Sequence, residues 1–118
     1  MGIKLGMITI DCVDPRGLAA FWTQALGVEV DQDHGGEFVI LRSQVENGPV
    51  FGFQRVPEPR AGKNRVHVDF GTDDGEKEVE RLIGLGAKKL DEQKVPGLAW
   101  TVLADPEGNE FCVATHHG

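Results

Sequence analysis

The segment MITIDCVDP at Met7–Pro15 returns in altered form as HVDFGTDDG at His67–Gly75. Each copy begins with a side chain that can point into a cavity, continues with strand-like residues and has an aspartate seven positions after its first residue. Met7 and Asp14 lie 60 positions ahead of His67 and Asp74. The chain is therefore predicted to consist of two similar halves.

The first half carries the signals of a strand followed by a helix. Strand-like residues 3–14 end at Asp14 and Pro15, which suit the N-cap and the first turn of a helix, and Gly27 suits its left-handed C-terminal cap. Between these signals, helical spacing is shown by the apolar residues Leu18, Phe21, Trp22, Ala25 and Leu26.

The second half repeats this order. Strand-like residues 65–74 end in an aspartate cap at Asp73 or Asp74, and Gly86 is the predicted stop of the helix. The apolar stripe of this helix consists of Val79, Leu82 and Ile83.

Short strands are predicted after each helix. They are 28–31, 37–42 and 50–55 in the first half, and 88–92, 99–104 and 110–115 in the second. The last two are joined by DPEGN, in which proline and glycine suit a tight turn. Turn geometry and solvation explain Asp105 and Glu107 better than catalysis does. The pattern predicts an α+β fold built from two tandem βαβββ modules.

One break divides the 118 residues, which is a length typical of one domain. The stretch RVPEPRAGKNR has two prolines, a glycine and no apolar periodicity, so it is predicted to be a solvated connector. We expect the first module at about 1–56, the linker at about 57–64 and the second module at about 65–118.

Charge and composition exclude several classes of partner. The formal net charge is −7, which argues against nucleic acid and against an anionic membrane surface. The sequence has two cysteines, no basic leader followed by an apolar segment, and no apolar run near 18 residues. These features predict a soluble cytoplasmic protein with reduced thiols.

Three motifs resemble the vicinal oxygen chelate superfamily, which includes glyoxalases, extradiol dioxygenases and bleomycin-resistance proteins. They are FWTQALG at the end of the first helix, RVHVDF at the start of the second half and DPEGNEFCV near the end. The resemblance covers nearly the whole chain. It implies a single domain with a cupped, partly closed mixed β-sheet and helices on the outside. Because the superfamily holds metal enzymes and metal-free binders, it does not decide the chemistry.

The resemblance also implies where a metal would be held. Metal-using relatives take one ligand from the opening strand and one from the closing strand of each half. Here these positions fall on Met7, His67, Cys112 and either Gly52 or Gln54. A thioether binds hard or borderline cations poorly, so His67 is the sole conventional ligand.

Strand alternation predicts which side chains face the cavity. Val66, Val68 and Phe70 form an apolar face suited to the covering helix, which turns His67 and Asp69 the other way. The same reasoning places these residues on the cavity side: Leu5, Met7, Thr9, Glu110, Cys112 and Ala114. Cys12 falls on the helix side, so a disulfide with Cys112 is not expected.

Most of these residues also have a structural explanation. His67 suits a histidine hydrogen-bonded to Asp69 or to the neighbouring strand, and Cys112 suits a small buried apolar residue. Nucleophilic catalysis is disfavoured because no residue is identified that would orient His67. Trp22 lies in the apolar stripe of the first helix and is expected to be in the core. Trp100 lies on the same face of its strand as Val102, and if that face points inward, its indole offers a flat surface for a planar ligand.

Two functions remain open. The first is a metal-independent protein, without catalytic residues, that sequesters an apolar or aromatic natural product or drug as a resistance protein does. Its expected ligand-binding residues are Leu5, Met7, Thr9, Gln54, His67, Asp69, Trp100, Val102 and Cys112. The alternative is a metal-dependent lyase, isomerase or dioxygenase in which Gln54, His67 and Cys112 hold one divalent ion. Either protein is expected to be a homodimer, because edge strands favour association.

Overall fold

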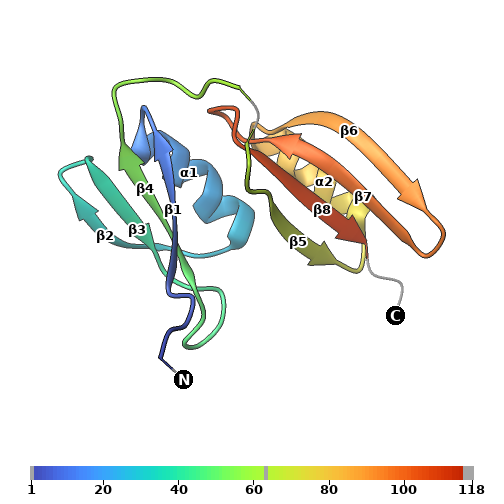
Figure 1. The fold of residues 1–118 in the computed structure, drawn as a ribbon, viewed down its shortest axis with the longest axis horizontal. Helices are drawn as coiled ribbons and strands as arrows, with labels where there is room; N and C mark the ends of the chain where they lie inside the picture. Colours follow the sequence, from blue (N-terminus) through green and yellow to red (C-terminus); the bar gives the residue numbers. More distant parts are fainter. Residues whose placement is uncertain (1, 63, 116–118) are drawn as a thin grey trace. The chain divides into compact units, whose positions relative to one another are not determined.

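The computed structural model describes residues 2–62 and 64–115. The chain forms two compact units, Met1–Pro59 and Arg60–Gly118, and each has the order βαβββ (Figure 1). The expected α+β fold with two tandem modules is confirmed. No helix among the described residues is long and apolar enough to cross a membrane.

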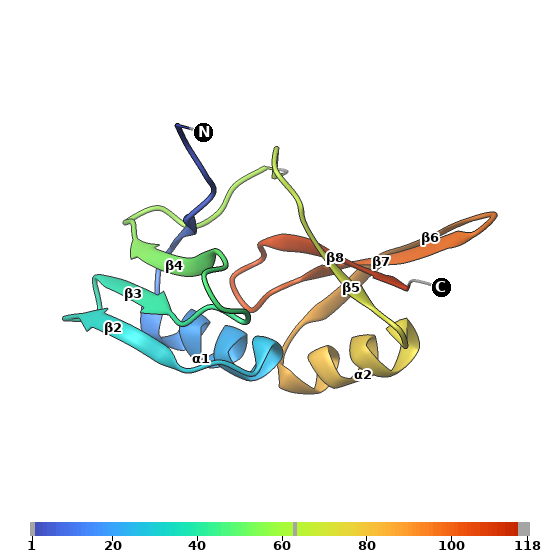
Figure 2. The same cartoon turned by 90° about the horizontal axis from the view of Figure 1, so that it is seen from below.

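The first unit has one helix on one face of a four-stranded mixed sheet (Figure 2). The sheet order is β1-β4-β3-β2, with β1 parallel to β4 and the other neighbours antiparallel. The elements are β1 (Met7–Cys12), α1 (Pro15–Leu26), β2 (Val30–His34), β3 (Phe38–Leu41) and β4 (Val50–Arg55).

Helix α1 begins and ends at its predicted caps. The Asp14 carboxylate accepts a hydrogen bond of 3.1 Å from the Gly17 amide, and Gly27 takes the left-handed conformation with φ of 69°. Trp22 is 2% exposed, and its ring lies 5.4 Å from that of Phe51 on β4 in an edge-to-face contact. An aromatic cluster therefore fills the space between α1 and its sheet.

The second unit repeats this arrangement with the sheet order β5-β8-β7-β6. Asp74, not Asp73, is the N-cap of its helix, since the Asp74 side chain accepts from the Lys77 amide at 3.2 Å. The elements are β5 (Val68–Thr72), α2 (Gly75–Leu85), β6 (Lys88–Val95), β7 (Leu98–Ala104) and β8 (Glu110–Thr115).

Strands β4 and β8 have their predicted bounds, whereas the opening strands start later than expected. Val66 is 75% exposed rather than covered by the helix, because β5 begins only at Val68 and strand alternation does not extend upstream of it. The strand predicted at 28–31 is present as β2, but its predicted start at Val28 is wrong. The Val28 amide still donates to the Thr23 carbonyl and so completes the end of α1, which delays β2 to Val30.

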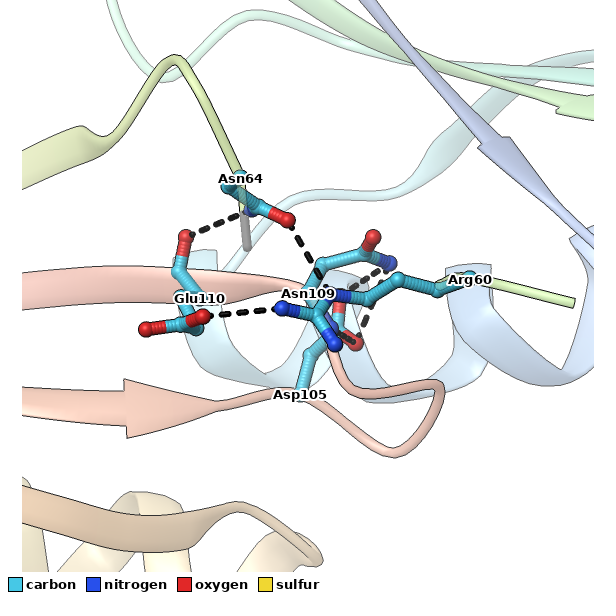
Figure 3. A network of polar contacts seen from close by, with 5 residues as sticks. All are labelled: Arg60, Asn64, Asp105, Asn109 and Glu110. Atoms are coloured by element: carbon cyan, nitrogen blue, oxygen red, sulfur yellow. Dashed lines mark hydrogen bonds and ion pairs between the residues drawn. The ribbon is translucent and has the colours of Figure 1, made fainter. Parts of the chain in front are cut away.

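The described part of the connector is largely exposed, as its composition predicted, but its end is attached to β8 by polar contacts. Arg60 donates to a Glu110 carboxylate oxygen at 2.8 Å and to the Asn64 side-chain oxygen at 3.0 Å, and Asn64 in turn donates to the Glu110 carbonyl (Figure 3). This ion pair is partly shielded from water, so the start of the second unit is fixed to β8.

The DPEGN turn is confirmed as a structural element. Asp105 is 4% exposed and accepts hydrogen bonds from the amides of Glu107 and Asn109 and from the Asn109 side chain (Figure 3). Gly108 has φ of 89°, a conformation that favours glycine. The Asp105 carboxylate is therefore buried with its hydrogen bonds satisfied, which is a correction to its expected solvation.

Candidate functional site

A groove of about 510 Å³ lies on the face of the second sheet that α2 does not cover. Its volume is within the range typical of small-molecule sites. The side chains and backbone that line it come from the start of β5, from β7 and from β8: His67, Asp69, Phe70, Gly71, Leu98, Trp100, Cys112 and Ala114.

Strand register explains why these residues meet. Asp69 on β5 pairs with Cys112 on β8, and Cys112 pairs in turn with Val102 on β7. One step along the same face, Trp100 pairs with Ala114. Four of the predicted site residues, His67, Asp69, Trp100 and Cys112, thus line one groove, and Val102 lies in the same row of the sheet without being part of its lining.

Cys112 is a buried thiol next to a carboxylate. It is 6% exposed, and its pKa is raised above the ordinary value, first by burial, then by the hydrogen bond to Asp69 and by the negative charges of Asp69 and Glu110. The thiol form is therefore favoured at neutral pH. Metal ligation and nucleophilic attack both need the thiolate, so the surroundings of Cys112 oppose both.

His67 is exposed and lies one residue ahead of β5. Within the described chain its ring has no hydrogen-bond partner, so neither the predicted bond to Asp69 nor the alternative bond to the neighbouring strand is formed. An imidazole without an orienting group is poorly placed for general-base catalysis but is able to donate or accept one hydrogen bond at the edge of a ligand.

Sequence reasoning missed three lining residues, Phe70, Gly71 and Leu98. Leu98 shares strand parity with Trp100, so extending β7 by one residue would have identified it. Phe70 was assigned to the helix side, where its ring does contact Phe111 edge-to-face at 5.9 Å, yet it also borders the groove.

The remaining predicted residues belong to the first unit. Met7, Thr9 and Gln54 lie on the face of the first sheet opposite α1, where Met7 pairs with Val50 and Thr9 pairs with Gly52. Leu5 is exposed and precedes β1, so strand alternation does not place it on this face.

Sheet register also decides between Gly52 and Gln54 as the counterpart of Cys112. Gly52 pairs with Thr9 just as Cys112 pairs with Asp69, so Gly52 is the equivalent position. A Cβ atom at Gly52 would lie 2.8 Å from the Met7 sulfur and 3.1 Å from the Phe38 ring. These two side chains therefore occupy the space that a ligand side chain at position 52 would need.

The donor set fits a divalent metal poorly. The four positions that correspond to ligands in metal-using relatives hold a thioether at Met7, no side chain at Gly52, an imidazole at His67 and a protonated thiol at Cys112. Among the described residues, no three histidine, cysteine, aspartate or glutamate side chains are grouped closely enough to hold an ion.

Paired βαβββ units with one open sheet face each define the vicinal oxygen chelate fold, as expected from the motifs. The sequence profile of the glyoxalase-like domain family matches residues 7–114, and the chain belongs to this family. No curated protein sequence matches the chain.

Solved structures agree on the fold. A glyoxalase/bleomycin resistance protein/dioxygenase family enzyme from Burkholderia phytofirmans PsJN has a TM-score of 0.81 at 20% identity, covering 98% of this chain and 100% of that chain. A glyoxalase-related enzyme from Fulvimarina pelagi has a TM-score of 0.74 at 17% identity, covering 96% and 88%. Lactoylglutathione lyase from Agrobacterium tumefaciens has a TM-score of 0.71 at 16% identity, covering 98% and 95%. At these identities the likeness concerns the fold alone.

Proposed function

We propose that the protein binds a planar, mostly apolar small molecule in the groove of the second unit without the help of a metal. The observation that carries this proposal is the combination of Trp100 and Leu98 with a few polar groups in one groove of about 510 Å³. Apolar walls with a small number of orienting polar groups are typical of ligand sites.

The chemistry of the groove favours binding over catalysis. The Cys112 thiol is held in its protonated form, and within the described residues no side chain orients the His67 ring. The positions that hold metal ligands in relatives carry Met7 and Gly52 in the first unit. Sequestration of a drug or natural product is the function that such a site would serve, and a homodimer is the assembly that we propose for it.

Trp100 provides the test. Ring stacking contributes about 0.5 to 1.5 kcal/mol beyond the burial of area, so Trp100→Ala should weaken the binding of aromatic probes by at least about tenfold. Affinity would be measured by calorimetry across a panel of aromatic natural products. Trp22→Phe is the matched control, because Trp22 lies in the core of the first unit.

Quenching of tryptophan fluorescence adds an independent readout. Quenching should disappear in Trp100→Phe and persist in Trp22→Phe. If it persists in Trp100→Phe and disappears in Trp22→Phe, the ligand binds elsewhere and the proposed site is wrong.

A further inference from the structure

Asp69 gives the groove a negative charge at a position that is uncharged in the first unit. Among the described residues that line the groove it is the one carboxylate, and neither lysine nor arginine is present. The equivalent position in the first sheet, paired with Gly52, is the uncharged Thr9. The first sheet has a carboxylate on its open face too, but it is at Asp11, one step further along β1, so the position of the charge beside Cys112 is particular to the second unit.

The Asp69 carboxylate lies beside a neutral thiol. Asp69 and Cys112 are paired across β5 and β8, and their interaction is one cause of the raised pKa of Cys112. No ion pair of Asp69 exists within residues 2–62 and 64–115, and the guanidinium of Arg60 is engaged by Glu110 at 2.8 Å. Asp69 is exposed, so a cation that reaches it keeps part of its hydration.

The groove thus presents an unpaired carboxylate and an indole in one small volume. A cation is attracted both to a carboxylate and to the face of an aromatic ring, and tryptophan is the strongest of the aromatic side chains in this respect. A flat ring that carries its own positive charge would use both groups at once, with its apolar surface against Leu98 and Trp100.

We infer that Asp69 is a specificity-determining residue that selects planar aromatic cations, such as quaternary or protonated heteroaromatic rings, over neutral rings of the same shape. This inference rests on the proposed function, since it concerns the ligand of the same groove.

A matched pair of probes tests the inference. N-methylquinolinium and quinaldine have nearly the same size and shape, but only the first carries a permanent charge. Calorimetry at about pH 8, where histidine side chains are ordinarily neutral, should give an affinity for N-methylquinolinium about tenfold higher than for quinaldine. Asp69→Asn should bring the two affinities within about twofold of each other, mainly by weakening the cation.

Asp73→Asn is the matched control variant. It removes one charge from the same unit, at an exposed residue between β5 and α2 that does not line the groove. The preference for the cation should persist in this variant. If Asp69→Asn and Asp73→Asn reduce the preference for the cation equally, the net negative charge of the chain selects the cation, and the inferred role of Asp69 is wrong.

The remaining outcomes separate the inference from the proposed function. Equal affinity of the wild-type protein for both probes overturns the role of Asp69 and leaves the binding groove in place. If neither probe binds, both proposals are overturned. Near-ultraviolet circular dichroism of each variant would confirm that the fold is retained.

Discussion

The two units share one topology but differ in the side chains that lie on the open faces of their sheets. In the first unit the aromatic rings of Phe21, Trp22 and Phe51 are buried under α1, and the open face has Met7 over Gly52. In the second unit, Trp100 and Cys112 face the open groove. Both units bury aromatic rings beside their helices, as Phe111 is in the second, but the second unit also has Trp100 available for a ligand on its open face.

This difference shows which features a repeat must keep. The aspartate cap is present in both units because each helix has unsatisfied amides at its start. The open face of each sheet has no such requirement, so the residues at equivalent positions can differ. The pair Thr9 and Gly52 in the first unit occupies the positions of Asp69 and Cys112 in the second.

The largest effect that the difference predicts is on stability. Trp22→Ala should lower the free energy of unfolding by about 3–5 kcal/mol, because it opens a large cavity among buried rings. Leu82→Ala, at the corresponding place in α2, should cost less, about 2–3 kcal/mol, since fewer atoms are removed. Denaturant titration would measure both. A larger cost for Leu82→Ala would contradict the assignment of the aromatic core to the first unit.

A smaller effect is expected at the DPEGN turn, a structural feature of the second unit. Asp105→Ala should destabilise the protein by about 2 kcal/mol, because the donors of Glu107 and Asn109 lose their shared acceptor. Asp105→Asn keeps one acceptor oxygen and should cost about half as much. Urea unfolding monitored by tryptophan fluorescence would show whether the loss follows this order, and an equal cost for both variants would exclude the hydrogen-bond explanation.

The smallest effect concerns the thiol in the groove. In a Cys12→Ala background, iodoacetamide should label Cys112 slowly at neutral pH, because a raised pKa keeps the thiol protonated. Asp69→Asn should lower the pKa of Cys112 and so accelerate labelling several-fold, although burial, the largest cause of the shift, remains. Mass spectrometry over a range of pH would follow the rate. Slower labelling in Asp69→Asn would contradict the assigned hydrogen bond.

Local signals in the sequence predicted much of the fold. The caps at Asp14 and Gly27 and the DPEGN turn depend on residues close together in the chain, and the structure confirms each of them. Strand alternation also placed Cys112 on the cavity side, because period-two alternation within one strand needs no knowledge of the neighbouring strands. It left the face of Trp100 open, which the pairing of β7 with β8 decides. Cys12 and Cys112, both described, form no disulfide.

Features that depend on pairing between distant strands could not be predicted in the same way. The choice of Gly52 over Gln54 required the register of β1 with β4, and the Asp69 contact with Cys112 required that of β5 with β8. The ion pair between Arg60 and Glu110 joins residues 50 positions apart, so composition alone could not predict it. Long-range geometry therefore decided the details of the candidate site.

Metal content and ligand affinity, measured on the same untagged protein, test the central claim most directly. The donor set predicts that elemental analysis finds far less than one divalent ion per chain and that chelation leaves the affinity for N-methylquinolinium unchanged. The account is contradicted by finding about one tightly held ion per chain that His67→Ala releases and whose removal abolishes binding of N-methylquinolinium.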